Sequence, residues 1–207
     1  MTSHEPTVFV VDDDPSVLKA LKRLLQSSGW KAVTFESADD FLGAHDPAAH
    51  GCLLLDMSMP GHDGLELQRR LTESGSSLPV VFLTGHGDVP SSVTAMRAGA
   101  VNFLSKPVND EALLASVAEA VQIDRAARRD NADVAVAHER LTTLTARERQ
   151  VLERVVAGRL NKQIADELGT GVKTIKVHRA RVMQKMDSKS LAQLARLVER
   201  MGILPRL

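Results

Sequence analysis

The chain has 207 residues, of which 43% are hydrophobic and 25% charged, with 26 acidic residues, 26 basic residues and one cysteine. This length has room for two domains of ordinary size, and a single cysteine excludes an intrachain disulfide. No apolar stretch approaches the roughly 18 residues that a membrane-spanning helix needs, and the polar start MTSHEPT is unlike a signal peptide, so we expect no membrane association.

The balanced total hides an asymmetry between the two halves of the chain. Residues 1–123 contain 16 acidic and 8 basic residues, a net charge of −8, which leaves 10 acidic and 18 basic residues, a net charge of +8, in residues 124–207. A difference of this size exceeds an accidental surface distribution. It predicts that the partner of the second half is a nucleic acid or another acidic surface.

Four short apolar runs in the first half each stop at polar residues. The runs TVFVV, CLLL, PVVFL and VNFLS end at Asp12–Asp13, Asp56, Thr84 and Lys106. Because they alternate with helical patterns, these runs predict the buried parallel strands of an α/β fold. Ligands bind outside the carboxyl ends of such strands, so we expect three carboxylates, a hydroxyl and an ammonium at one edge of the sheet.

The residue types at this edge predict phosphoryl transfer. Three crowded carboxylates repel one another unless a cation joins them, and hard oxygen ligands with room for water suit Mg²⁺ (or Mn²⁺). A metal-neutralised aspartate is able to act as a nucleophile and accept a phosphoryl group as an acyl phosphate. Lys106 would then balance charge on the phosphoryl oxygens, and Thr84 would donate a hydrogen bond to one of them.

Residues 7–123 resemble the receiver domain of two-component response regulators. The matching segments are VFVVDDD (8–14), LLLDMSMPGHDG (53–64), VVFLTGHGDV (80–89) and AGAVNFLSKP (98–107). The resemblance implies a five-stranded, parallel, doubly wound sheet of the flavodoxin-like kind. It also implies that Asp56 is the phosphoacceptor, supplied by a sensor histidine kinase and assisted by Thr84 and Lys106.

The resemblance assigns further roles around this edge. The metal ligands that it implies are Asp12, Asp13, Asp56 and the backbone carbonyl of Ser58. Thr84 and Phe103 would form a switch pair, in which Phe103 turns inward when Thr84 closes on the phosphoryl group, and the Lys106–Pro107 bond would be cis. Ser58 stands where relatives often carry a larger or basic residue, which leaves the lifetime of the phosphoryl group open.

The join between the halves predicts a helix rather than a flexible linker. Residues 108–157 contain no Gly or Pro, and their first part is rich in Ala, Glu, Arg and Leu. An apolar stripe at helical spacing (Leu113, Val117, Ala120) thins after residue 123. We therefore predict a receiver domain at 1–123, a helical linker at 124–140 with a possible break near Asn131, and a second domain at 141–207. A partly frayed, solvated helix is the alternative.

The second domain is predicted to be all-α, with four helices. LTARERQVLERVVAG (144–158) opens with Thr145 and Glu148 in the capping-box pattern and ends at Gly158. NKQIADELG (161–169) is expected to be capped by Asn161. A Gly-containing turn then leads into VKTIKVHRARVMQKM (172–186), which makes a helix-turn-helix whose second helix enters the DNA major groove.

The second helix of this motif separates into two faces. Ile175, Val182 and Met186 recur at helical spacing and are expected to pack inward. The outward stripe is expected to contain Lys173, Lys176, Val177, Ala180 and Gln184, flanked by Arg179, Arg181 and Lys185. A basic, solvated helix is the alternative, but the preceding helix and turn favour DNA binding.

Residues 144–202 resemble the LuxR-type DNA-binding domain. The matching segments are LTARERQVL (144–152), NKQIADELG (161–169), TIKVHR (174–179) and MQKM (183–186). The resemblance implies that Lys176, Val177 and Ala180 face bases, with Lys173, Thr174 and Arg179 nearer phosphates. Thr170 and Gly171 depart from the family pattern, and Gly is the weaker helix cap, so we expect a slightly looser turn. The last helix (190–202) carries a leucine stripe that either packs on the domain or pairs with a second copy.

This domain pair is similar to the FixJ/NarL-type regulators and implies a cytoplasmic transcription factor, not an enzyme. Phosphorylation of Asp56 would favour a homodimer through the fourth helix (about residues 88–98), the fifth strand and the fifth helix. The partners implied are a sensor histidine kinase, double-stranded promoter DNA and RNA polymerase. Two rivals stay open: a haloacid-dehalogenase-type phosphatase, suggested by the DxD pattern at residues 12–14, and a constitutive DNA-binding protein with an idle site.

Overall fold

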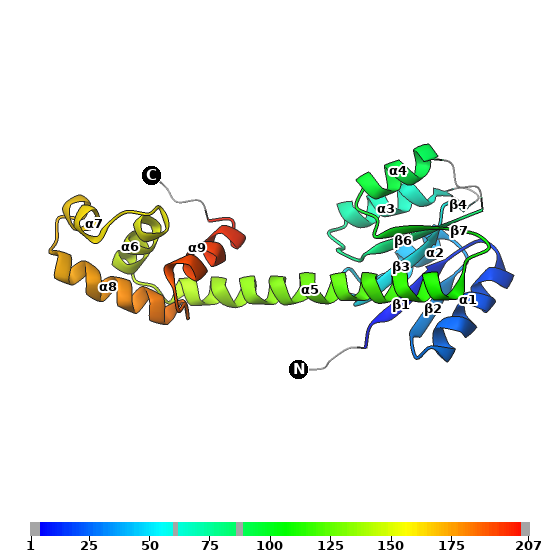
Figure 1. Cartoon of the computed structure of the whole chain (residues 1–207), viewed down its shortest axis with the longest axis horizontal. Helices are drawn as coiled ribbons and strands as arrows, with labels where there is room; N and C mark the ends of the chain where they lie inside the picture. Colours follow the sequence, from blue (N-terminus) through cyan, green and yellow to red (C-terminus); the bar gives the residue numbers. More distant parts are fainter. Residues whose placement is uncertain (1–4, 60–61, 86–88, 204–207) are drawn as a thin grey trace. The chain divides into compact units, whose positions relative to one another are not determined.

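The computed structural model describes residues 5–59, 62–85 and 89–203. These residues belong to two compact units, an N-terminal unit that ends at Arg128 and a C-terminal unit that begins at Arg129 (Figure 1). The division lies inside helix α5 (Asp110–Thr142), which contributes residues to both units. This helix runs through Asn131 without the break that we considered, so the join is helical as predicted.

The N-terminal unit is built on a five-stranded parallel sheet with the strand order β2-β1-β3-β6-β7. The strands are β1 (Thr7–Val11), β2 (Lys31–Phe35), β3 (Gly51–Asp56), β6 (Val80–Thr84) and β7 (Asn102–Ser105). Every residue of β3 and β6 is buried, which explains why these strands read as continuous apolar runs. The sheet confirms the predicted doubly wound α/β architecture.

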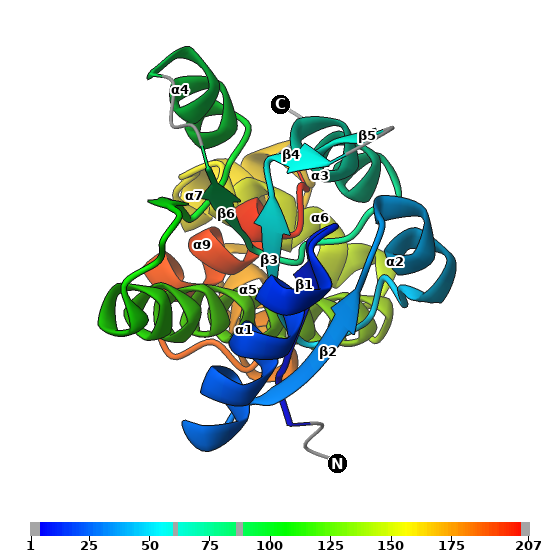
Figure 2. The same cartoon turned by 90° about the vertical axis from the view of Figure 1, so that its right-hand side faces the viewer.

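Helices cover both faces of this sheet, as Figure 2 shows. The helices are α1 (Pro15–Ser27), α2 (Ala38–Ala44), α3 (Gly64–Glu73), α4 (Val89–Arg97) and the first half of α5. One core joins α1 and α5 to the strand face that includes Val10 and Leu54. The other joins α2, α3 and α4 to the opposite face, which includes Leu53 and Leu55. The predicted start of the fourth helix at residue 88 lies outside the described residues.

Two structures in this unit were not predicted. Strands β4 (Ser58–Met59) and β5 (His62–Asp63) form a short antiparallel pair directly after β3. On α5, the buried carboxylate of Asp124 accepts a hydrogen bond from the Gly51 amide at 3.1 Å and another from Arg128 Nε at 2.8 Å. Arg128 also donates to the carbonyl of Ala49. These bonds tie the fourth turn of α5 to the start of β3.

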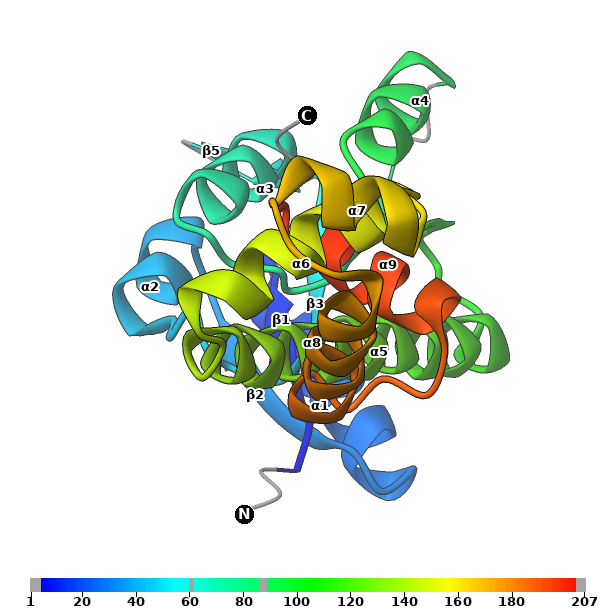
Figure 3. The ribbon, with the colours of Figure 1, turned by 90° about the vertical axis from the view of Figure 1, so that its left-hand side faces the viewer.

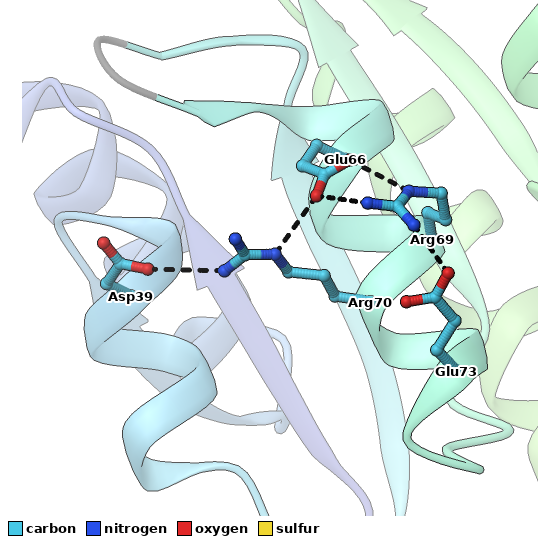
Figure 4. Close-up of polar contacts among 5 residues, drawn as sticks. All are labelled: Asp39, Glu66, Arg69, Arg70 and Glu73. Atoms are coloured by element: carbon cyan, nitrogen blue, oxygen red, sulfur yellow. Dashed lines mark hydrogen bonds and ion pairs between the residues drawn. The ribbon is translucent and has the colours of Figure 1, made fainter.

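An exposed ion-pair network lies on α3 (Figure 4). Arg69 contacts Glu66 and Glu73, both at 2.6 Å, and Arg70 contacts Glu66 at 3.2 Å. Arg70 also lies 3.8 Å from Asp39 on α2, so the network reaches the neighbouring helix. Surface pairs of this kind contribute little to stability because water and salt screen them.

The C-terminal unit is helical and has its own apolar core (Figure 3). Its helices are the end of α5, α6 (Ala146–Val156), α7 (Asn161–Glu167), α8 (Val172–Lys185) and α9 (Leu191–Arg200). Leu194 and Val198 of α9 are buried in this core together with Ala137 of α5. The leucine stripe of the last helix therefore packs on its own unit, although Leu191 remains exposed.

No helix in the described part of the chain is both long enough and apolar enough to cross a membrane.

Candidate functional site

The carboxyl edge of the sheet brings together the five residues that the sequence singled out. Lys106 follows β7, and its Nζ lies 2.5 Å from Asp12 Oδ2 and 3.2 Å from Asp56 Oδ2. One carboxylate oxygen from each of Asp12, Asp13 and Asp56 falls within 4.8 Å of the others. Thr84 ends the neighbouring strand β6 and is buried. Four strand ends therefore deliver these groups to one place, as parallel topology requires.

Backbone hydrogen bonds fix the geometry of this edge. The amide of Asp12 donates to the Phe35 carbonyl at 3.2 Å, and Asp12 Oδ1 accepts from the Asp14 amide at 3.0 Å. The amide of Lys106 donates to the Thr84 carbonyl at 2.6 Å. The Lys106–Pro107 bond is cis, as the family resemblance implied. These bonds hold the residues that directly follow β1 and β7 against the ends of the neighbouring strands β2 and β6.

The charges at this edge depend on one another. Burial raises the pKa of Asp56 above its ordinary value, and the nearby charge of Asp12 acts in the same direction, while Lys106 opposes both without cancelling them. Burial alone would lower the pKa of Lys106, but its hydrogen bonds and charge interactions with the two aspartates outweigh burial and raise it. Asp12 is fully buried and Asp56 nearly so. Removing the Lys106 ammonium would leave the buried carboxylates of Asp12 and Asp56 repelling each other.

The donor set fits a hard divalent cation. All the candidate side-chain ligands are carboxylate oxygens, the type that Mg²⁺ prefers. Asp12 and Asp56 are buried, whereas Asp13 is exposed, so water molecules have access to one side of the group. This half-open arrangement suits an ion, such as Mg²⁺, that keeps several of its water ligands and takes few ligands from the protein.

Ser58 and Phe103 are within three residues of Asp56 and Lys106, respectively, in the sequence, and they differ in exposure. Ser58 begins β4 and is exposed, and its backbone amide is one of the groups that oppose the rise in the pKa of Asp56. Phe103 of β7 is half-buried, with its ring centroid 6.4 Å from that of Phe82.

Gly64 is a site residue to which the sequence analysis assigned no role. A Cβ atom at this position would lie 2.6 Å from the Asp56 carbonyl oxygen, which is closer than real contacts allow. The Gly64 amide also donates to the Met57 carbonyl at 3.0 Å. Gly64 therefore lets α3 start directly against the strand end that carries Asp56. The signal was present in the sequence as the glycine that closes LLLDMSMPGHDG.

In the C-terminal unit, α8 has the two faces that were predicted. Ile175, Val182 and Met186 are fully or almost fully buried. The exposed residues are Val172, Lys173, Thr174, Lys176, Val177, Ala180, Arg181 and Gln184. An exposed helical face with cations and small apolar groups suits the major groove, where cations hold phosphates and other side chains reach base edges.

The start of α7 differs from the prediction. Asn161 is the first helical residue, and Leu160 occupies the cap position, with its amide donating to Gln163 Oε1 at 2.8 Å. Asn161 Oδ1 instead accepts a hydrogen bond from Arg179 on α8 at 3.1 Å. The prediction that Asn161 caps α7 was wrong because a glutamine later in the helix bonds the cap amide. Gly171 is the cap of α8 without a side-chain bond, as expected.

Lys185 also has partners that the sequence did not suggest. Its Nζ lies 2.7 Å from Glu148 Oε2 and 2.9 Å from the Thr143 carbonyl. Hydrogen bonds from Lys185 and from the Thr145 amide lower the pKa of Glu148 to about 2. Glu148 also forms the predicted capping box with Thr145 at the start of α6. Lys185 thus stabilises the unit through a buried carboxylate.

Comparison with known proteins identifies both units. Residues 8–118 match the family described as the response regulator receiver domain, and residues 142–198 match bacterial regulatory proteins of the luxR family. Nodulation protein W of Bradyrhizobium diazoefficiens is 43% identical over 201 residues, which cover 97% of this chain and 88% of the relative. The transcriptional regulatory protein FixJ of the same species is 42% identical over 197 residues, covering 95% and 96%.

A solved structure supports the same relationship. The response regulator StyR is 47% identical in sequence and has a TM-score of 0.77, over 95% of this chain and all of that chain. Similarity of this extent covers both units and the helix that joins them.

Proposed function

The chain belongs to the response regulators that join a receiver domain to a LuxR-type DNA-binding domain, and on this premise we propose that phosphorylation of Asp56 controls its binding to DNA. As a DNA-binding response regulator of a two-component system it is a transcriptional regulator and not an enzyme, which removes the phosphatase alternative. The observation that carries the proposal is the arrangement of Asp12, Asp13 and Asp56 around the Lys106 ammonium.

Asp56 is proposed to be the phosphoacceptor for a sensor histidine kinase. A carboxylate oxygen of Asp56 attacks phosphorus, the P–N bond to the kinase histidine breaks, and the leaving imidazole takes up a proton. Asp12, Asp13, Asp56 and the Ser58 carbonyl would hold Mg²⁺, which neutralises charge on the carboxylates and the phosphoryl oxygens. Lys106 already lies between the two buried aspartates and contributes a second cation to the same oxygens.

The conformational response is proposed to involve Thr84 and Phe103. Thr84 ends β6 beside the site, and its hydroxyl would donate to a phosphoryl oxygen on Asp56. Phe103 pairs with the β6 strand through Phe82, its neighbour in register, and is only half-buried. Phosphorylation would shift an existing equilibrium toward the state in which Thr84 moves to the phosphoryl group and Phe103 fills the space behind it.

The activated protein is proposed to dimerise through the face that α4 provides with β7 and α5. Val93 and Met96 of α4 are 42% and 48% exposed, so this face offers apolar area to a second copy. A homodimer places two recognition helices about one DNA turn apart, and the two sites then bind cooperatively. Once bound at a promoter, the dimer would act on RNA polymerase.

Helix α8 is proposed to enter the major groove. Lys176, Val177 and Ala180 lie on its exposed face and would address base edges. Lys173, Thr174 and Arg181 are exposed beside them and would bind phosphates. The remaining candidates, Arg179 and Lys185, have protein partners and need a separate argument.

Sedimentation velocity of the full chain, with and without Mg²⁺ and beryllofluoride as a phosphoryl mimic, tests the proposal. We expect a monomer that becomes a dimer only when both reagents are present. The Asp56→Asn variant should stay monomeric under all conditions. A wild-type protein that stays monomeric under all conditions, and whose DNA binding measured in parallel is the same with and without both reagents, would support constitutive binding with an idle site instead.

A further inference from the structure

Arg179 and Lys185 occupy the same recognition helix, yet their charges have different partners. Lys185 Nζ lies 2.7 Å from the buried carboxylate of Glu148. Arg179 donates to the neutral amide oxygen of Asn161 at 3.1 Å. Among the residues that the structure describes, no carboxylate forms an ion pair with Arg179. The charge of Lys185 is therefore compensated inside the protein, and that of Arg179 is not.

The side chain of Asn161 is used in an unusual way. Asparagine near a helix start commonly accepts a hydrogen bond from an amide of its own helix. Here the cap amide of Leu160 is bonded by Gln163, which leaves Asn161 Oδ1 to Arg179, 18 positions further along the chain on α8. Both residues are half-buried, so the bond restricts the guanidinium at the junction of the two helices of the motif.

A neutral hydrogen-bond partner suits an arginine that binds phosphate, because it holds the guanidinium in place without cancelling its charge. An acidic residue at position 161 would hold Arg179 equally well but would cancel much of its charge and repel a phosphate. An amide restricts the side chain, which lowers the entropic cost of binding, and leaves the full positive charge available. Arg179 carries five N–H donors, and the bond to Asn161 uses one of them.

We propose that Asn161 is a positioning residue for DNA binding, which orients the Arg179 guanidinium toward a backbone phosphate without neutralising it. Lys185, in contrast, acts inside the protein as the partner of Glu148 and makes no net phosphate contact. This inference rests on the proposed DNA-binding role of α8. Of the three cations that flank the outward stripe of α8, it assigns Arg179 to DNA and Lys185 to the stability of the fold, while Arg181 is exposed.

The salt dependence of binding separates these roles. Each phosphate contact contributes about −0.9 to the slope of log K against log salt concentration. We would measure this slope for the full chain on a duplex of roughly 20 base pairs, which is long enough for two half-sites. Arg179→Ala is expected to reduce the slope by about 0.9 for each protomer bound, and Lys185→Ala to leave the slope unchanged while lowering the unfolding midpoint.

Two substitutions at Asn161 distinguish positioning from a structural role. Asn161→Ala should weaken binding in the wild-type background and have no further effect when Arg179 is alanine. Asn161→Asp should keep the bond to Arg179 and the unfolding midpoint, yet reduce the salt slope at least as much as Arg179→Ala. A purely structural role predicts that aspartate substitutes for asparagine without loss of binding.

The outcomes have separate meanings. If wild-type protein does not bind duplex DNA at any salt concentration, the proposed function fails. If it binds, the inference is overturned when Asn161→Asp binds like the wild type, when Asn161→Ala weakens binding equally without Arg179, or when Lys185→Ala changes the slope as much as Arg179→Ala does. The double variant measures the coupling between Asn161 and Arg179, because the hydrogen bond from the Leu160 amide to Gln163 at the start of α7 involves neither of these side chains.

Discussion

The carboxylate edge of the N-terminal unit and helix α8 of the C-terminal unit carry the functional charge of this protein in opposite ways. The edge crowds buried aspartates around one lysine, with Asp12 fully inaccessible to solvent. Helix α8 spreads Lys173, Lys176 and Arg181 over an exposed face. A small, highly charged ligand requires groups that converge in a fixed geometry, whereas a long polyanion requires charges distributed along a surface.

In this chain, burial and not residue type therefore determines how much the loss of a charged partner costs. A buried charge is costly to leave without its partner, while an exposed one is screened by water and salt. The largest effects should therefore follow from changing buried charges, and the smallest from changing exposed pairs, within either unit.

Asp56→Asn is expected to have the largest effect, because it removes the proposed nucleophile. The variant should incorporate no phosphoryl group from radiolabelled acetyl phosphate in the presence of Mg²⁺, under conditions in which the wild type is labelled. Asp46→Asn, which changes an exposed aspartate of the same unit, is the matched control and should be labelled normally. Persistent labelling of Asp56→Asn would place the phosphoacceptor elsewhere.

Arg128→Ala tests a buried charge outside the site. The substitution removes the Arg128 guanidinium from the Asp124 carboxylate, which is 1% exposed, and leaves the His50 ring 3.9 Å away from it. The expected loss is about 3 kcal/mol in the free energy of unfolding of the N-terminal unit. Urea unfolding followed by fluorescence of Trp30, the one tryptophan of the chain, reports on this unit.

Arg129→Ala is the control for that experiment, because Arg129 is the next residue of the same helix and is exposed. Its unfolding curve should coincide with that of the wild type. Equal destabilisation by both substitutions would mean that helix propensity, and not the Asp124–Arg128 pair, accounts for the result.

Glu148→Gln tests a buried charge in the C-terminal unit. The pKa of Glu148 falls from 4.5 to about 2 on folding, which corresponds to an upper limit of about 3 to 4 kcal/mol. Solvent screening at the partly exposed Lys185 reduces the expected loss to about 2 kcal/mol. Because the folded-state pKa is depressed, this stability is present above pH 4.5 and is lost as the pH falls toward 2.

Amide hydrogen exchange in α6 and α8 measures this effect for the C-terminal unit alone. Glu148→Gln should accelerate exchange at neutral pH and remove part of the acid sensitivity between pH 4.5 and 2. Glu153→Gln, on the same helix, is the control and should do neither. The proposed role of the Glu148–Lys185 pair is contradicted if the two variants show the same acid profile.

The network on α3 provides the smallest expected effect. Arg69→Ala breaks the contacts to Glu66 and Glu73 that Figure 4 shows, but Arg69 and Glu73 are exposed and Glu66 is partly exposed. Screening by water should leave the urea midpoint, followed by Trp30 fluorescence, within experimental error of the wild type. A shift as large as that of Arg128→Ala would show that exposure does not separate the two classes of charge.

Much of the molecule could be predicted from local patterns. The strands that carry Asp56 and Thr84 are buried apolar runs, so their positions and the edge where they end follow from the sequence. The capping box of Thr145 and Glu148 and the inward stripe of α8 are likewise local patterns. Both kinds of pattern arise from contacts between neighbours in the chain.

The predictions were incomplete where a partner lies far away in sequence. Asn161 was expected to cap its own helix, but its acceptor bonds Arg179, and Lys185 was expected to face DNA, but it contacts Glu148. The role of Gly64 depends on the close approach of Asp56 in space. None of these pairings leaves a periodic signal, because each depends on how two packed elements meet.

Local patterns in the chain are enough to predict the two-domain α/β and helix-turn-helix architecture, the edge at which the aspartates and Lys106 meet, and the exposed face of α8. These follow from hydrophobic periodicity and from the rule that parallel strands end at a common edge. The pairing of charges could be read only from the packed elements: Asp124 is paired with Arg128, Glu148 with Lys185, and Arg179 with no carboxylate among the described residues. Compensation depends on distances of a few ångströms between elements, and such distances are fixed by packing.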